Sequence, residues 1–145
     1  MKLHEGCIIE SNNLLKNDYF SKSKIFIIQH NHNGSIGFVI NKQSRKHFIV
    51  GNKKFFMYNG GPVKTNDYNL LHTAPLEIAG SIHILHGIYW KNNITGDNTE
   101  LLNTSIQNIK IFKGYCGWDA KELEKEVKDG YWDVLEASAQ QVLNS

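Results

Sequence analysis

The segment KGYCGWD, residues 113–119, places Cys116 between two glycines, after an apolar run and before a helical pattern. A strand, a sharp glycine turn carrying a nucleophile, and a helix make up the nucleophile elbow of hydrolases. That elbow also needs glycine two positions after the nucleophile, and Trp118 stands there instead. A single cysteine is more often a small buried hydrophobic side chain than a catalyst. We therefore expect Cys116 to lie in a structural turn and to be inert.

Seven histidines raise the question of a metal site, but their spacing does not favour one. His83 and His86 would point to opposite faces of a strand, because they differ in parity. His30 and His32 share parity, although His32 falls in a predicted hairpin turn. Neither pair has the cysteine or carboxylate spacing of a known metal motif. The sequence predicts no metal and no cofactor.

The segment YNGGPV, residues 58–63, concentrates residues that permit unusual backbone geometry. Gly60 and Gly61 allow a tight turn, and Pro62 keeps the residue before it out of the helical region. Bare backbone N–H groups in such a turn could approach an anionic or planar ligand closely. A sharp exit from a strand requires the same residues without any ligand, and this interpretation is the stronger of the two.

Short apolar runs, rich in β-branched and aromatic side chains, predict the elements that position these residues. Expected strands cover residues 24–30, 35–42, 47–50, 54–58, 69–73, 81–90 and 109–112. One helix is expected to begin at Asp97 or Asn98 and to continue through Leu101, Leu102, Ser105 and Ile106. A second is expected to be capped by Asp119 and to end at Gly130. Many strands and no regular alternation of strand and helix predict a single α+β domain.

Composition agrees with a soluble globular protein of one domain, since 41% of the 145 residues are hydrophobic and 21% are charged. The apolar runs have the length of strands, so no membrane-spanning segment is predicted. The N-terminal residues lack the apolar region of a signal peptide, and two cysteines do not make a disulfide framework. A cytoplasmic location is expected.

Charge is distributed unevenly although the net charge is only +2. Eight basic residues lie between Lys22 and Lys64, while no acidic residue occurs between Asp18 and Asp67. Such a segment could hold a polyanion, or it could simply be balanced by the acidic C-terminal part of the fold. Only one of the sixteen basic residues is arginine, the side chain best suited to fork onto phosphates and guanine. Any nucleic-acid binding is therefore expected to be weak and non-specific.

Several blocks of the chain together resemble the YqgE/AlgH family of small bacterial proteins: DYFSKSKIFIIQHNHNGSIGFVINK, YNGGPV, LLHT, GIYW, and GYCGW followed by LEKEV and GYW. The resemblance extends from about Gly6 to Trp132. It implies one domain over residues 1–145, built as a coiled, branching, mainly antiparallel sheet with flanking helices. It supplies no established biochemical activity, only a label of transcriptional regulator, and the sequence shows no helix-turn-helix.

Two departures from the family pattern affect the interpretation. Members usually carry Ala or Ser where this chain has Cys116, so the cysteine replaces a small residue. The chain also ends with WDVLEASAQQVLNS, without the tryptophan-containing C-terminal helix of many members. The surface that this helix covers is expected to be open or differently covered.

The function that we expect is non-catalytic binding or regulation, with an unidentified small ligand or protein held in a groove between the GGPV and GYCGW segments. The candidate contacts are Asn41, Gly60, Gly61, Pro62, His72, Tyr115, Trp118, Glu124 and Trp132. Exposed aromatic side chains beside glycine turns suit a planar ligand or a peptide. The alternative is a small enzyme that uses His72 with Glu124 or Glu126 as acid and base. A third interpretation is that these motifs only specify the fold.

Trp118 immediately precedes the expected helix cap, where an apolar residue commonly packs against the fourth helical residue as a hydrophobic staple. Counted from Asp119, that residue is Leu123. We therefore expect the Trp118 ring to be buried against Leu123.

Overall fold

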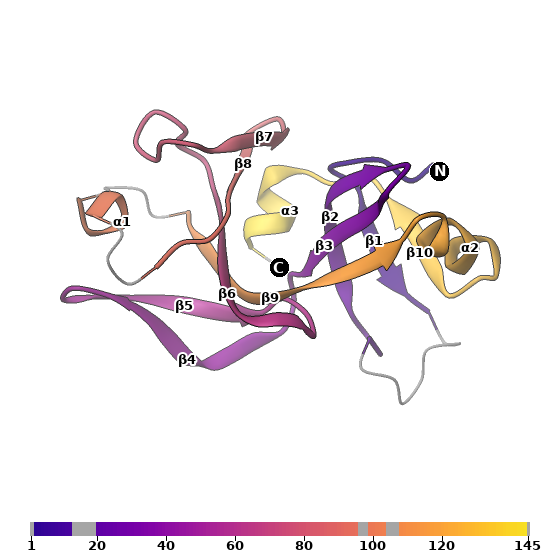
Figure 1. Cartoon of the computed structure of the whole chain (residues 1–145), viewed down its shortest axis with the longest axis horizontal. Helices are drawn as coiled ribbons and strands as arrows, with labels where there is room; N and C mark the ends of the chain where they lie inside the picture. The colour runs from indigo at the N-terminus through magenta and orange to yellow at the C-terminus, as the bar shows by residue number, and fades with distance from the viewer. Residues whose placement is uncertain (1, 13–19, 96–98, 104–107, 145) are drawn as a thin grey trace.

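The computed structural model describes residues 2–12, 20–95, 99–103 and 108–144. Within these ranges, ten strands and three short helices follow one another along the chain (Figure 1). The strands are β1 (Ile8–Ser11), β2 (Lys24–Asn31), β3 (Gly34–Val39), β4 (Gln43–Val50), β5 (Lys53–Asn59), β6 (Val63–His72), β7 (Ile82–Leu85), β8 (Ile88–Lys91), β9 (Lys110–Asp119) and β10 (Trp132–Leu135). The helices are α1 (Thr99–Asn103), α2 (Glu122–Lys128) and α3 (Ala139–Leu143).

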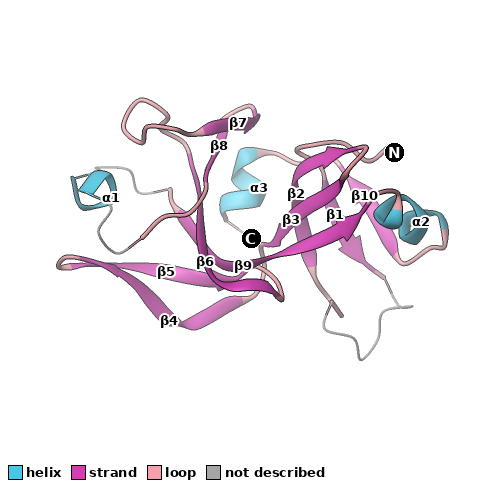
Figure 2. Cartoon of the chain, in the orientation of Figure 1, coloured by secondary structure: helices cyan, strands magenta, loops and turns pink. Residues whose placement is uncertain are grey.

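The strands form one sheet that curls into a half-barrel, and most of the described chain is strand or loop (Figure 2). Neighbours follow the order β10-β1-β2-β3-β9-β6-β8-β7, and the hairpin β4–β5 joins this sheet through β5. Adjacent strands run antiparallel except that β5 runs parallel to β9 among the described pairs. The predicted α+β class therefore holds only broadly, because the fold is mainly antiparallel β-structure with a few helices at its margin.

Strand β9 is the branch point of the sheet. Its first half lies between β5 and β6, with Ile111 opposite Met57 on one side and Leu70 on the other. Its second half pairs with β3, where Cys116 lies opposite Gly37. The predicted turn at 113–118 is therefore wrong: these residues continue the strand as far as Asp119.

Three clusters of buried apolar side chains fill the two sides of the curled sheet. The first lies under α2 and β10 and contains Cys7, Ile9, Ile25, Ile27, Val39, Cys116, Trp118, Leu123 and Trp132. The second lies under α3 and contains Ile8, Phe26, Ile28, Phe38, Ile40, Leu71, Ile88, Phe112 and Val142. The third lies between the β4–β5 hairpin and α1 and contains Phe48, Val50, Met57, Leu70, Ile78, Ile94, Leu101 and Ile111.

Helix α2 begins later than the sequence predicted. Its N-cap is Lys121, in the left-handed conformation and without a side-chain cap, so Asp119 does not cap the helix. The Glu122 carboxylate instead accepts a hydrogen bond from the Asp119 N–H at 3.1 Å. The predicted exit at Gly130 is confirmed, since this glycine has a φ of 88° and its N–H donates to the Val127 carbonyl.

Two other expected elements differ from the structure. The run 81–90 is not one strand, because it folds back at His86–Gly87 into the pair β7 and β8. The helix expected near residues 97–106 appears as α1 in its central part. Its other expected positions, Asp97, Asn98, Ser105 and Ile106, lie outside the described residues.

Candidate functional site

The GGPV and GYCGW segments meet where the β5–β6 connection crosses β9. Gly60 donates its N–H to the Lys113 carbonyl at 2.9 Å, and its own carbonyl accepts the Val39 N–H at 2.9 Å. A Cβ atom on Gly61 would lie 2.1 Å from the carbonyl carbon of Tyr115. Gly114 has a φ of 72°, and a Cβ there would lie 2.4 Å from the Gly61 carbonyl oxygen. The glycines are thus required by direct contact between two backbones.

A hollow of about 570 Å³ opens beside this crossing. Its lining includes two lysines and no acidic side chain: Lys42, Asn59, Gly61, Pro62, Thr65 and Lys113. Asn59 stands between the two lysines, because its N–H donates to the Lys42 carbonyl at 2.9 Å and it pairs with Lys113 on β9. We call these six residues the lysine groove. Two cations held by adjacent backbone segments make it suited to an anionic group.

A second hollow, of about 350 Å³, lies beside Val63, the first residue of β6. It is lined by Gln29, Asn31, Asn33, Gly34, Ser35, Ile36, Val63, Tyr115, Gly117, Trp118 and Asp119. Val63 pairs with Tyr115 and follows Pro62 directly, so this tyrosine hollow adjoins the lysine groove. The single groove predicted between the two motifs is therefore divided in two by residues 62–63.

Trp118 and Trp132 contribute little to either hollow because both are buried in the first cluster, at 8% and 3% exposure. Their rings lie 6.3 Å apart in an edge-to-face arrangement. Both indole N–H groups donate to the same oxygen of Glu126, at 3.0 and 2.9 Å. This carboxylate thereby ties α2 to β9 and β10. Trp118 shares its cluster with Leu123, as expected, although the staple positions are wrong because the helix begins at Glu122.

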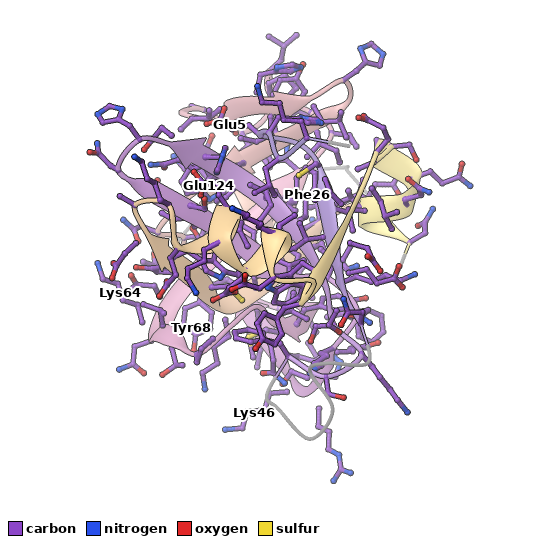
Figure 3. All side chains as sticks on the ribbon, turned by 90° about the vertical axis from the view of Figure 1, so that its right-hand side faces the viewer. Glu5, Phe26, Lys46, Lys64, Tyr68 and Glu124 are labelled. Atoms are coloured by element: carbon purple, nitrogen blue, oxygen red, sulfur yellow. The ribbon has the colours of Figure 1, made fainter. Side chains whose placement is uncertain are left out.

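Asn41 and Glu124 take no part in the lining of the hollows described here. The Asn41 side chain accepts the Lys24 N–H at 3.0 Å and donates to the Lys22 carbonyl at 2.9 Å, which braces the two chain segments. Glu124 lies on the exposed side of α2 (Figure 3). The structure thus brings together Gly61 and Pro62, and separately Tyr115 with the edge of Trp118, from the predicted set.

His72 is fully buried at the end of β6 and bonded through both ring nitrogens. Nδ1 accepts the Ala74 N–H at 3.0 Å, so Nε2 carries the proton and donates to Ser81 Oγ at 2.7 Å. The Ser81 hydroxyl donates in turn to the Ile78 carbonyl. Burial lowers the pKa of His72, against an opposing effect of Glu100, and this favours the neutral ring that the hydrogen bonds require.

The proposed acid–base pair of His72 with Glu124 or Glu126 is therefore wrong. His72 pairs with Tyr89 of β8, whereas both glutamates lie on α2, at the right-hand side of Figure 1 and away from β6 and β8. Among the described residues, a histidine and a carboxylate do meet at His4 and Glu136, 3.3 Å apart, but both side chains are exposed. That pair lies outside the two hollows described above.

Lys110 is the buried ionisable group that the sequence analysis missed. Its ammonium group donates to the Ile40 carbonyl at 2.7 Å and to the Val142 carbonyl at 3.0 Å, and lies 4.3 Å from the Tyr58 ring centre. Burial lowers its pKa to about 8. Strand parity could have indicated this position, because Lys110 shares a face with the buried Phe112. The contacts hold α3 against the sheet.

A third hollow, of about 570 Å³, lies between α3 and the sheet and includes none of the predicted residues. Its lining mixes apolar side chains with one lysine, one glutamate and several amides: Ile8, Lys24, Ile40, Leu135, Glu136, Ser138, Gln140, Gln141 and Asn144. In the part of the chain that the structure describes, no three His, Cys, Asp or Glu side chains form a group able to hold a metal ion. No described helix is long and apolar enough to cross a membrane.

Comparison with known proteins gives relatives along nearly the whole chain. A family model described as AlgH-like matches residues 7–145. A UPF0301 protein of Chlorobium luteolum is 34% identical over 148 residues, which cover 94% of this chain and 76% of the relative. A UPF0301 protein of Bacteroides thetaiotaomicron is 31% identical over 151 residues, with 96% and 74% covered.

Two solved structures share the fold. The solution structure of the AlgH protein from Pseudomonas aeruginosa aligns with a TM-score of 0.80 at 21% identity, covering 99% of this chain and 85% of that protein. A crystal structure from Corynebacterium diphtheriae aligns with a TM-score of 0.79 at 16% identity, covering 99% and 81%.

Proposed function

Since this chain belongs to the AlgH-like family, we propose that it is a non-catalytic binding protein with a regulatory role, whose ligand occupies the lysine groove. The ligand class is a small anion, such as a phosphate ester, with its charged group between Lys42 and Lys113. The observation that carries the proposal is the placement of these two lysines on either side of Asn59.

The surroundings of the lysines support this ligand class. Asn59 and Thr65 add an amide and a hydroxyl that can bond to anionic oxygens, and no acidic residue lines the groove. Its volume of about 570 Å³ suits a small molecule. The groove is also rigid on one side, because Gly61 packs directly on the backbone of Tyr115. A preformed site loses less entropy when a ligand binds.

The neighbouring tyrosine hollow extends the proposal to a ligand with a planar part. Tyr115 is half-buried there beside Val63, one residue beyond the Pro62 edge of the lysine groove. A planar group attached to the anion could rest against this ring. Asn31, Asn33 and Ser35 supply polar side chains around it.

Occupied side chains weigh against the enzyme alternative. Both ring nitrogens of His72 are bonded to Ala74 and Ser81, and Glu126 accepts two indole N–H groups. The acid–base set that the sequence offered is thus committed to holding the fold.

A regulatory role would act through the bound ligand and not through a DNA-reading helix. The described helices α2 and α3 are short and are separated by β10, which differs from a helix-turn-helix. Both cysteines are free and buried, which is typical of a reducing compartment and supports a cytoplasmic location as part of the proposal.

Titration of the protein with inorganic pyrophosphate, followed by amide chemical shifts, tests the proposal. We expect shifts at Asn59, Gly61 and Lys113, and an affinity about tenfold lower for Lys42→Gln or Lys113→Gln, because each removes a charge-assisted hydrogen bond. Lys121→Gln, which changes an exposed lysine next to α2, is the matched control and should bind as the unmodified chain does. Equal affinity in all four proteins would overturn the proposal. Native mass spectrometry of protein purified from cells would then identify any retained ligand.

A further inference from the structure

The β4–β5 hairpin has one buried face and one open face. Phe48, Val50 and Met57 point inward to the third cluster, where α1 covers them. The opposite face carries two large apolar side chains that are mostly in solvent, Ile49 at 56% exposure and Phe56 at 63%. β4 pairs with β5 alone among the described strands, so the hairpin extends from the body of the sheet (Figure 1).

Strand register gathers the exposed side chains on this open face. His47 lies opposite Phe56 and Ile49 lies opposite Lys54; the two pairs are alternate rungs of the ladder and therefore share a face. The rings of His47 and Phe56 are 5.5 Å apart between centroids and are tilted by 36°. Both side chains are exposed, and exposed aromatic faces are the surfaces on which unpaired bases stack.

Basic side chains lie on the same hairpin as these rings, and no acidic residue occurs along this stretch of chain. Arg45, Lys46 and Lys54 are exposed on the hairpin, and Lys46 lies at the lower edge of the molecule in Figure 3. No Asp or Glu occurs at residues 19–66. Charge complementarity therefore indicates a polyanion, and the open rings indicate one with unpaired bases.

We propose that the open face of the β4–β5 hairpin binds single-stranded nucleic acid, with bases stacked on Phe56 and His47 and phosphates bound by Arg45 and Lys54. The protein binds the strand without sequence preference, because every base can stack on an aromatic ring. The face also carries a single arginine, the side chain that most often makes specific contacts to bases. A duplex binds less well, since its bases are already stacked on one another. This site uses residues outside the lysine groove, so the proposal does not depend on ligand binding in that groove.

Fluorescence anisotropy with a labelled thymidine strand of about 20 nucleotides tests the site. Phe56→Ala is expected to weaken binding about tenfold, the loss that follows removal of one stacked base. Phe56→Tyr keeps a ring and should bind normally. Leu76→Ala, which removes another exposed apolar side chain from the loop between β6 and β7, is the matched control and should also bind normally.

Salt dependence tests the phosphate contacts separately. Lys54→Gln should lower the slope of log affinity against log salt by about 0.7, as expected when one contact to a single strand is lost. Lys121→Gln should leave the slope unchanged.

Absence of binding at low salt, equal binding by Phe56→Ala, or equal affinity for a duplex would each overturn the proposal. So would binding to anionic phosphatidylserine vesicles without binding to the oligonucleotide, because the face would then be a membrane contact. Circular dichroism of each variant confirms that it is folded.

Discussion

Gly61→Ala should be one of the most damaging single methyl additions in this chain. The added Cβ would lie 2.1 Å from the Tyr115 carbonyl carbon, 2.2 Å from its oxygen and 2.5 Å from the Cys116 nitrogen. All three are backbone atoms of β9, so no side chain can rotate away. The β5–β6 connection must therefore move off β9.

That movement has an energy that can be worked out from the contacts it breaks. The hydrogen bonds of Gly60 with Lys113 and Val39 would be lost or lengthened, at about 1 kcal/mol each. Overpacking adds about 1–3 kcal/mol. The free energy of unfolding should fall by about 3–5 kcal/mol in total, which lowers the melting temperature by roughly 10 °C in a chain of this size.

Urea denaturation followed by circular dichroism measures this loss, and Gly117→Ala is the matched control. Gly117 lies on the same strand crossing, but a Cβ there would meet only a ring carbon of Tyr115 at an ordinary 3.5 Å. Its substitution should be neutral or should stabilise by about 0.4–1 kcal/mol, because alanine restricts the unfolded chain. Equal midpoints for the two variants would refute the argument that backbone contact requires glycine at position 61.

Three further predictions concern buried groups. Trp118→Ala should destabilise by about 3–5 kcal/mol, because it empties a buried site; a midpoint like that of Leu76→Ala, which alters a fully exposed side chain, would contradict this. Lys110 has a folded-state pKa of about 8, below its unfolded value, so the unfolded chain binds more protons between these values and the stability contribution rises with pH there. Relative to Lys110→Met, the unmodified chain should gain about 2 kcal/mol from pH 8 to pH 10 by urea denaturation, and parallel pH profiles would disprove it. Cys7 and Cys116 should not react with a thiol reagent under native conditions, since both are buried and burial raises the pKa of Cys116 to about 12; a fast-reacting thiol would show the packing to be wrong.

The sequence was informative wherever a structure depends on neighbouring residues. Alternating and β-branched runs predicted the cores of β2, β3, β5 and β9, and the glycine at position 130 marked the end of α2. It failed where a distant segment decides the conformation. Gly114 and Gly117 indicate a turn by local rules, yet Gly117 pairs with Ile36 of β3, and Gly114, with a φ of 72°, makes only a local irregularity between the β6 pairs of Lys113 and Tyr115.

The candidate site shows the same limit. The GGPV and GYCGW motifs do meet, but the sequence could not indicate that residues 62–63 separate two hollows. The lysines of the groove carry no motif, because Lys42, Asn59 and Lys113 become neighbours only through hydrogen bonds between strands. His72 looked available because its partners Ala74 and Ser81 can be identified only in the folded chain.

The branch at β9 also has a consequence for synthesis of the chain. β3 ends at Val39 and its partner β9 begins at Lys110, about 70 residues later. At ribosomal rates of about 5–20 residues per second, β3 waits roughly 4 to 14 s with an unpaired edge. β1 waits longer still for β10. The nascent chain therefore presents open strand edges that can template wrong pairing, and the sheet closes only after β10 has been synthesised.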